Sequence, residues 1–378
     1  MAKSTCKTVT SCRLIRSADK CEFLEGDMPD NSESLFAITE RGSNSHLDEF
    51  SIKPLHGPEK VWLIVKDLDE ERIRLVEGDV LKLGRALFRV KQLSPDGETR
   101  PMFASQVPAT PVDIYDPGLG QILACRICLS DIQSEENPLI SPCKCAGTMK
   151  FIHLECLQNW LKSRLNLKQN GSALSYFWRT LDCELCKEDF PTCIQIREKS
   201  RDLVEVHKPN CPFIVLEDIK RDQASRENSS RGLHVVSMSD DSGFKLGRGH
   251  DCDIRISDIS VSRTHAEICL RTGGFYLQDK DSKFGTLVQV KRPLHLVPGS
   301  PLSLQINRTV VVVKVKQPWG LLQCCRCLQK SPQLVTSSIG KSLDERESAA
   351  EDGPGAVRES EAVRGAEERL IALNIHHD

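Results

Sequence analysis

Short runs of apolar residues, separated by polar turns, make up most of the chain. The runs KVWLIVKDL and LVEGDVLKLGRALFRVKQL lie within residues 34–93, and FIVLEDI, LHVVSMS, HAEICL, GFYLQD and TVVVVKV lie within residues 212–317. Turn sequences such as DDSG, RTGG and VPGS separate the later runs. Many short strands at this spacing are typical of a β-sandwich, which we therefore predict for residues 212–317.

One stretch has the spacing of a helix instead. In HLECLQNWLKSRL the apolar residues lie three or four positions apart, as they do on one face of an α-helix. These residues are Leu154, Leu157, Trp160, Leu161 and Leu165. The sequence therefore predicts one amphipathic helix in an otherwise strand-rich chain.

Composition divides the chain further. Residues 1–33 are polar, and residues 331–378 hold ten acidic and five basic residues with little apolar content, so we expect both segments to be disordered. A strand-rich region at 34–93 is followed by a Pro-rich linker at 94–120 and a Cys-rich module at 121–195. We therefore expect a multidomain protein, in agreement with a length of 378 residues.

The charge and the apolar content set limits on partners and location. The net charge is −2, which does not favour binding to nucleic acid or to an anionic membrane. The first residues lack the apolar core of a secretory signal, and no apolar run approaches the ~20 residues of a membrane span. We therefore expect a soluble intracellular protein, cytoplasmic or nuclear. Its 17 cysteines would be reduced there, so clustered thiols indicate metal ligands before disulfides.

Eight ligand-type residues stand in four pairs within the Cys-rich module. The pairs are Cys125 and Cys128, Cys143 and Cys145, His153 and Cys156, and Cys183 and Cys186. A Cys-x-x-Cys pair places two thiolates about as far apart as two corners of a zinc tetrahedron, and two pairs close one structural site. We therefore expect two structural Zn²⁺ ions with no open coordination position. The alternative, ordinary buried cysteines, is hard to reconcile with four correctly spaced pairs.

The order and spacing of these ligands resemble the RING-CH zinc finger, which has histidine as its fifth ligand. The stretch NPLISPCKCAGTMKFIHLECLQNWL carries much of the resemblance. The rival is the PHD finger, which has the same order of ligands but usually places histidine earlier and a tryptophan just before the seventh ligand. Here the histidine comes later and Trp178 lies too far before Cys183. The RING arrangement implies crossed pairing, in which the first and third pairs hold one zinc and the second and fourth pairs hold the other.

The RING-CH resemblance also implies a function. Such modules bind a ubiquitin-conjugating enzyme through a shallow apolar patch and hold its ubiquitin thioester in a reactive pose, without a covalent intermediate. The resemblance assigns the patch to Ile127, Trp160 and Leu185, and a contact with ubiquitin to Lys187. An apolar side chain between two zinc ligands cannot enter the core, so an exposed Ile127 implies a partner. Two alternatives stay open, namely core packing for Trp160 and an ordinary solvated lysine for Lys187.

A second resemblance lies in FKLGRGHDCDIRISDISVSRTHAEICL, residues 244–270. This stretch is similar to the forkhead-associated (FHA) domain, a β-sandwich that binds phosphothreonine peptides. The resemblance implies a phosphate site on converging loops, because phosphate recognition needs fixed positive charge and hydrogen-bond donors. The residues implied are Arg248, Ser262 through its hydroxyl and backbone N–H, and Arg263 or Lys283.

Two further positions bear on the FHA resemblance. His265 is expected to be a buried residue that braces the loop. The asparagine that usually holds the peptide backbone is Phe284 here, which leaves peptide affinity and sequence preference open. An FHA domain that only mediates protein contacts is the alternative. Residues 34–93 are open to two interpretations, a degenerate copy of this domain or a strand-rich region with a coincidental likeness to it.

The leading hypothesis is a RING-type E3 ubiquitin-protein ligase. Its RING-CH module would recruit a ubiquitin-conjugating enzyme and ubiquitin, and its FHA domain would bind a phosphothreonine-containing protein. The expected fold is a small α+β cross-braced two-zinc module plus an all-β FHA-type sandwich, with a strand-rich N-terminal region and a disordered tail. Two other functions stay open. One is a non-catalytic, zinc-stabilised phosphopeptide-binding adaptor, and the other is a chromatin reader, if the finger behaves as a PHD finger.

Overall fold

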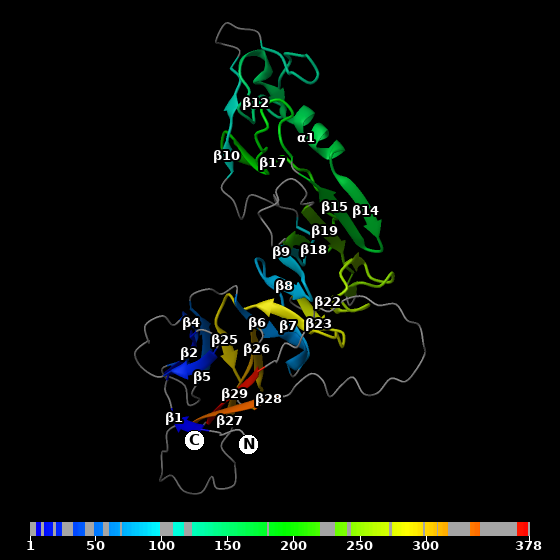
Figure 1. Ribbon diagram of the computed structural model, residues 1–378. Coiled ribbons are helices and arrows are strands. Elements are labelled where there is room, and N and C mark those ends of the chain that lie inside the picture. Colours follow the sequence, from blue (N-terminus) through cyan, green and yellow to red (C-terminus); the bar gives the residue numbers. More distant parts are fainter. Residues whose placement is uncertain are drawn as a thin grey trace, which may run out of the picture. The chain divides into compact units, whose positions relative to one another are not determined.

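The structure of the chain is a computed structural model in which the described residues form two compact units (Figure 1). Unit 1 comprises Met1–Ile73, Gln278–Asp281 and Gly285–Asp378, and unit 2 comprises Arg74–Leu277 and Ser282–Phe284. Most of the linker and of the acidic tail expected from the sequence lies outside the described residues. The described residues are 5–8, 11–17, 20–24, 33–41, 49–55, 60–68, 70–98, 109–116, 123–179, 181–219, 231–239, 243–271, 274–297, 299–307, 309–316, 333–340 and 369–376.

Unit 1 contains an antiparallel sheet with the strand order β25-β5-β4-β2-β3. Apolar side chains such as Phe36, Phe50 and Ile52 are buried in it. The strands are β2 (Ser11–Ser17), β3 (Lys20–Leu24), β4 (Glu33–Arg41), β5 (Glu49–Pro54) and β25 (Leu294–Leu296).

A second sheet of unit 1 is built around β6 (Val61–Ile64), which is followed by the short 3₁₀ helix η2 (Val65–Asp67). β6 pairs antiparallel with both β24 (Thr286–Gln289) and β26 (Leu302–Ile306). β26 pairs in turn with β27 (Thr309–Lys316), whose alternate valines are buried, as in a strand with one face on a core. Buried side chains of both sheets join in one hydrophobic core, so unit 1 is a β-sandwich.

Three further strands belong to unit 1. β29 (Arg369–His376) pairs parallel with β27, and β28 (Gln333–Gly340) pairs antiparallel with β29. β1 (Thr5–Thr8) pairs antiparallel with β28. Strands from both ends of the sequence therefore contribute to the same unit. Residues 1–33 were expected to be disordered, but their described residues form β1, β2, β3 and the start of β4, and β1 and β2 pair with strands from later in the chain.

Unit 2 contains six antiparallel strands in the order β8-β9-β18-β19-β15-β14. The register of β18 with β9 shifts between Val215 and Leu216, where Lys91 is an extra residue in β9. These strands are β8 (Val80–Leu83), β9 (Ala86–Ser94), β14 (Asn166–Asn170), β15 (Ala173–Trp178), β18 (Phe213–Ile219) and β19 (Arg231–Ser237). The segment 34–93 is thus shared, because β4, β5 and β6 lie in unit 1 and β8 and β9 lie in unit 2.

A second sheet of unit 2 carries the sequence that resembles an FHA domain. Its strand order is β21-β20-β22-β23, with Phe244, Leu246 and Ile268 buried. The strands are β20 (Gly243–Gly247), β21 (Ile254–Arg255), β22 (Ala266–Arg271) and β23 (Gly274–Asp279), and β7 (Arg72–Arg74) lies where the chain passes between the units.

The Cys-rich module has its own core, into which the predicted helix packs. Helix α1 (Leu154–Ser163) buries Leu154, Leu157 and Leu161, so the helical spacing is confirmed, and it is the one α-helix among the described residues. The N–H of Glu155 in its first turn donates to the Asn137 side chain (3.0 Å). The other elements are β10 (Thr110–Pro111), β11 (Asp113–Ile114), β12 (Leu139–Ser141), η4 (Gly147–Met149), β13 (Ile152–His153), β16 (Cys193–Ile196) and β17 (Lys199–Asp202).

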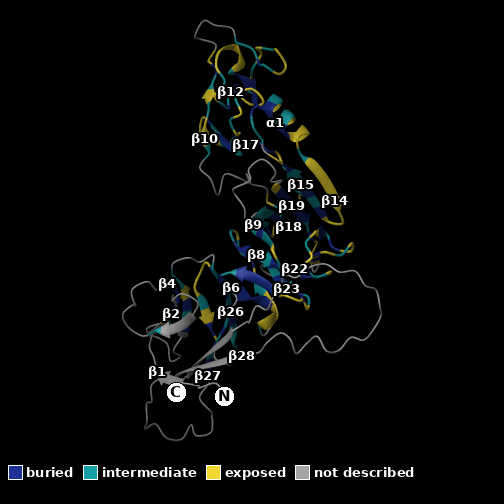
Figure 2. Ribbon diagram, viewed as in Figure 1, coloured by how far each residue is buried: buried dark blue, intermediate teal, exposed yellow. Residues whose placement is uncertain are grey.

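The hairpin β14–β15 joins the Cys-rich module to the strands around β18. β15 pairs with β19 along its whole length, and β14 is exposed throughout (Figure 2). Tyr176 and Trp178 of β15 share a buried core with Phe213 and Leu233. The Cys-rich module is therefore continuous with the sheet of unit 2, which the sequence did not predict. The part of the chain that the structure describes holds no helix with the length and apolar content of a membrane span.

Candidate metal centre and phosphate-binding loops

The two Cys-x-x-Cys turns share one backbone geometry. The Leu129 N–H donates to the Cys125 carbonyl (N···O 2.8 Å), and the Lys187 N–H donates to the Cys183 carbonyl (2.9 Å). Leu129 and Lys187 have φ angles of 63° and 58°, a left-handed conformation that is uncommon outside glycine. Such strain persists only where the surroundings impose it. Here it closes each turn so that both thiols of the pair face the same point.

The eight predicted ligands come together in two groups of four. Within each group all ligand atoms lie within 4.8 Å of one another, which suits the corners of a metal-centred tetrahedron. The first group is Cys125, Cys128, His153 and Cys156, and the second is Cys143, Cys145, Cys183 and Cys186. The structure therefore has the crossed pairing, and each group could hold one metal ion.

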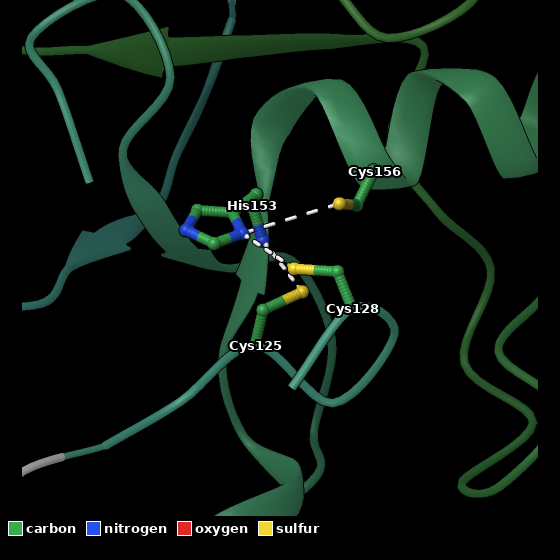
Figure 3. Close-up of side chains that lie close together, drawn as sticks. All are labelled: Cys125, Cys128, His153 and Cys156. Carbon is green, nitrogen blue, oxygen red and sulfur yellow. Dashed lines mark hydrogen bonds between the residues drawn. The ribbon is translucent and has the colours of Figure 1, made fainter. Parts of the chain in front are cut away.

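His153 is oriented for a metal by the hydrogen bond of its other ring nitrogen. Its Nδ1 lies 3.2 Å from the Cys128 sulfur and 3.9 Å from the Cys156 sulfur (Figure 3). Its Nε2 lies 2.9 Å from the carbonyl oxygen of Ile132, which can only accept a hydrogen bond. The proton therefore sits on Nε2, and the Nδ1 lone pair is left for a metal.

Hydrogen bonds prepare one thiol in each group for ionisation. Burial raises the pKa of Cys125, but the N–H groups of Cys128, His153 and Ile127 outweigh it and bring the pKa to about 7. Burial likewise opposes ionisation of Cys183, while backbone N–H donors and the guanidinium of Arg126 bring its pKa to about 6. A thiolate is the form that binds metal, so each group has at least one ligand close to that form near neutral pH.

The phosphate-binding residues expected from the sequence meet at Ser262. The Arg248 N–H donates to the Ser262 carbonyl (2.9 Å), and the Arg248 Nε donates to the Val261 carbonyl (3.3 Å). The Lys283 N–H donates to the Ser262 hydroxyl oxygen (3.0 Å), which leaves the hydroxyl proton free to be donated. The side chains of Arg248 and Lys283 are exposed, as is that of Arg263. One loop pair thus gathers positive charge around one hydroxyl.

His265 braces this loop, as expected. It is fully buried, and its Nδ1 accepts a hydrogen bond from the Ser262 N–H (3.0 Å). This contact corrects one detail of the sequence interpretation, since the Ser262 N–H is already directed at His265. The hydroxyl is then the group of Ser262 that can still donate a hydrogen bond.

A turn outside the FHA-like stretch holds the loop before Ser262. The Arg85 N–H donates to the Ser260 hydroxyl (2.9 Å), and the Arg85 guanidinium pairs with Asp258 (3.1 Å). Gly84, with φ of 56°, has no room for a β-carbon against Ser260. Hydrogen bonds from the Ser260 hydroxyl and N–H, together with Arg85, hold the pKa of Asp258 at about 2. Asp258 is therefore ionised at neutral pH, and its charge is matched by Arg85.

Comparison with known proteins decides between the RING-CH and PHD interpretations of the metal-binding module. Residues 125–186 match the model of the RING-variant domain, and residues 244–310 match that of the FHA domain. The chain carries a RING-variant domain and an FHA domain. The PHD interpretation, and with it the chromatin-reader hypothesis, has no support from these matches.

The curated relatives share only part of their length with this chain. E3 ubiquitin-protein ligase MARCHF7 of Rattus norvegicus is 32% identical over 148 residues, which are 37% of this chain and 18% of that protein. E3 ubiquitin-protein ligase MARCHF1 of Homo sapiens is 44% identical over 66 residues, 18% of each chain. E3 ubiquitin-protein ligase MARCHF8 of Xenopus laevis is 36% identical over 109 residues, 29% of this chain and 34% of that protein. The chain therefore spans well under half the length of these relatives, and no solved structure matches it significantly.

The RING-variant domain exposes two of the three predicted patch residues. Ile127 and Leu185 hold the same position in their knuckles and are 44% and 59% exposed. Trp160 is half-buried, with its ring edge-to-face against Phe190 at 5.9 Å between centroids. It therefore serves the core and still presents part of its ring to solvent. Lys187, directly after the last ligand, is exposed.

Trp160 is tied to the second knuckle of the RING-variant domain. The Arg164 guanidinium lies over the Trp160 ring at 4.7 Å from its centroid and forms an ion pair with Glu184. Glu184 is the neighbour of Leu185 in the chain. The helix and the last knuckle therefore present their candidate contacts on adjoining parts of the surface.

Arg126 is a residue of this domain that the sequence analysis missed. It lies in the first knuckle, yet its guanidinium reaches the second group, 3.3 Å from the Cys183 sulfur and 3.9 Å from the Cys143 sulfur. It also donates to the Met149 carbonyl (2.8 Å). Its place between two ligands was visible in the sequence, but the direction of its side chain depends on the crossed pairing.

We expect Arg126→Ala to weaken metal binding by the second group about tenfold or more, because partners outside the ligand shell typically contribute 10- to 100-fold to affinity. Competition with a chromophoric zinc chelator measures this, and one of two zinc affinities should fall. Lys144→Ala is the matched control, since Lys144 stands between two ligands but pairs with Glu188 (2.7 Å) instead of a thiol. Equal affinities in both variants would contradict the role of Arg126.

Proposed function

We propose that this chain acts as a RING-type E3 ubiquitin ligase, with one structural Zn²⁺ in each ligand group. The exposure of Ile127 and Leu185 carries this proposal. Each lies between two metal ligands, so the knuckle fixes its direction and burial elsewhere is not possible without loss of the site. Two large apolar side chains held outward in this way are suited to a protein partner. The three relatives named above, each an E3 ubiquitin-protein ligase, support the same function.

In this proposal the protein positions the conjugating enzyme and its ubiquitin thioester and forms no covalent bond with either. The conjugating enzyme would contact Ile127 and Leu185 and the exposed part of Trp160. Lys187, beside the last ligand, would reach the ubiquitin that the enzyme carries as a thioester. Holding both in one pose raises the rate because the attacking amine meets an oriented thioester. The zinc ions would supply folding free energy only, since all four ligands of each group come from the protein.

The FHA domain would select the protein partner by binding a phosphothreonine in it. A phosphothreonine carries close to two negative charges, and the exposed Arg248 and Lys283 side chains with the Ser262 hydroxyl match it in charge and hydrogen bonding. Phe284, 58% exposed, stands where an asparagine would contact the peptide backbone. Phosphate reading would then depend more on charge than on backbone contacts.

The test of the proposed activity is a ubiquitination assay of the full chain, loaded with zinc, against a panel of ubiquitin-conjugating enzymes. Conjugate formation that depends on the chain and on zinc supports the proposal. If zinc-loaded protein forms no conjugates with any enzyme of the panel, the non-catalytic adaptor replaces the ligase.

The phosphate site makes a prediction of its own. Loss of one charged partner from a contact with an ion typically costs about 1.5–3 kcal/mol, roughly ten- to a hundredfold in affinity. We therefore expect Arg248→Ala to weaken binding of a phosphothreonine peptide pool by that factor, as measured by titration of the full chain. Arg201→Ala removes the same charge from an exposed residue of β17 and should leave binding unchanged. Wild-type protein that binds phosphorylated and unphosphorylated pools equally would show that the domain does not read phosphate.

A further inference from the structure

The tip of the β14–β15 hairpin contacts the loop that follows Arg248. The Asn170 side-chain amide donates to the Cys252 carbonyl (2.6 Å) and to the Asp253 carbonyl (3.3 Å). The N–H and hydroxyl of Ser172 each lie 3.4 Å from the Asp253 carboxylate. The hairpin belongs to the RING-variant domain, between its sixth and seventh ligands, whereas the loop belongs to the FHA domain.

The contacted loop is also the loop that presents Arg248. Beyond the Arg248–Ser262 bond, the Gly249 N–H and the Cys252 thiol both donate to the Arg263 carbonyl (2.8 and 3.1 Å). The other oxygen of Asp253 accepts from the Lys245 N–H (2.9 Å). The hairpin tip therefore contacts one end of this loop, and Arg248, which is proposed to bind phosphate, lies at the other end.

The tip fits closely against this loop. Gly171 has a φ of 52°, and a β-carbon at this position would overlap the carboxylate of Asp253. The Asn170-Gly171 turn thus brings its backbone up to the loop, which is a reason for glycine here beyond its conformational freedom.

The hairpin itself is held by buried contacts. The Ser175 hydroxyl of β15 lies 2.8 Å from Nδ1 of His234 in β19, and His234 Nε2 lies 3.1 Å from Asp218 in β18. Ser175 and His234 are 7% and 4% exposed, so this line of hydrogen bonds crosses three strands and is buried up to the partly exposed Asp218. Such a network resists bending of the hairpin relative to the sheet.

We infer that Asn170 is a positioning residue for phosphopeptide binding, and that the hairpin couples the RING-variant domain to the FHA domain. The coupling rests on the proposed function of the FHA domain as a phosphate reader. Asn170 would hold the 248–253 loop from the side of the RING-variant domain and keep Arg248 in place. By reciprocity, a phosphopeptide that orders this loop would also order the hairpin.

The experiment compares the full zinc-loaded chain with Asn170→Ala, using amide hydrogen exchange and titration with the phosphothreonine peptide pool. Asn170→Ala removes both hydrogen bonds of the side-chain amide, the shorter one to Cys252 and the longer one to Asp253. Loss of the shorter neutral hydrogen bond alone shifts an equilibrium about two- to tenfold. We expect the amides of 248–253 to exchange faster, and the pool to bind more weakly, by about this factor. In the wild type the pool should slow exchange in 166–178, and in Asn170→Ala this protection should be lost. If Asn170 merely stabilised the fold, the pool would still slow exchange in 166–178 of Asn170→Ala, as it does in the wild type.

Asn166→Ala is the matched control, because Asn166 is an exposed asparagine at the other end of β14. It should keep the exchange rates, the affinity and the protection of the wild type. The inference fails if Asn170→Ala behaves like Asn166→Ala in exchange of 248–253. If the wild type binds phosphorylated and unphosphorylated pools equally, the proposed phosphate reading fails instead. Exchange of 248–253 then tests only whether Asn170 holds this loop, with faster exchange supporting that role and unchanged exchange overturning it.

Discussion

Ile127→Ala is expected to lower ubiquitin transfer by at least about thirtyfold while zinc content and fold are kept. Truncation of a central apolar contact in an interface costs about 2 kcal/mol or more, and 1.4 kcal/mol is tenfold. The fold should survive because the side chain is 44% exposed and its place is fixed by the flanking ligands. The measurement is the rate of conjugate formation with the most active enzyme of the panel.

Ile259→Ala is a suitable control for this experiment. Ile259 is 84% exposed and lies in the FHA domain, so the same methyl groups are removed without effect on the knuckle. Transfer should proceed at the wild-type rate. A rate for Ile127→Ala that equals the rate of this control would remove the observation on which the ligase proposal depends.

Cys143→Ser is expected to unfold the metal-binding module and to reduce the bound zinc from two ions to one or none. Structural zinc contributes about 10–16 kcal/mol in small zinc modules, which is as large as the entire stability of a typical domain. Cys143 belongs to the second group, whose other members lie on either side of the helix in the sequence. Elemental analysis gives the zinc content, and amide exchange over 123–204 reports the unfolding.

Cys193→Ser separates loss of a ligand from loss of any buried thiol. Cys193 is 3% exposed and lies in strand β16, outside both ligand groups. This variant should keep two zinc ions and lose only a little stability. A Cys143→Ser protein that also retains two ions and slow exchange would disprove the second site.

Most features of the metal-binding module could be predicted from short stretches of sequence. The two ligands of each pair are separated by only one or two residues, so their spacing alone brings two donors to one point. The period of Leu154, Leu157 and Leu161 was enough to predict the helix. Exposure of Ile127 followed from the same local geometry. Arg126 could not be predicted in this way, since its contact with Cys183 crosses 57 positions of the chain.

The strands are a different case. Alternation in TVVVVKV predicts a strand, and β27 is one, but no local pattern says which strand lies beside it. The pairing of β6 with β24 and β26 joins segments more than 200 residues apart. β15, which lies within the RING-variant domain, pairs with β19, which lies between this domain and the FHA domain in the sequence. Apolar faces of similar composition fit many partners, so only the packing of the whole chain selects among them.

The sequence by itself therefore determined the four ligand pairs and the helix, because each depends on residues close together in the chain. The crossed grouping of the pairs and the candidate phosphate-binding residues were implied by the resemblance to known families. Only the tertiary structure decided that residues 33–64 and 286–316 share one core, that Arg85 braces the loop at Ser260, and that Asn170 contacts the loop of Arg248. The physical reason is the same for all three. Each is a contact between distant segments, set by the register of paired strands, and a register is fixed by both partners together.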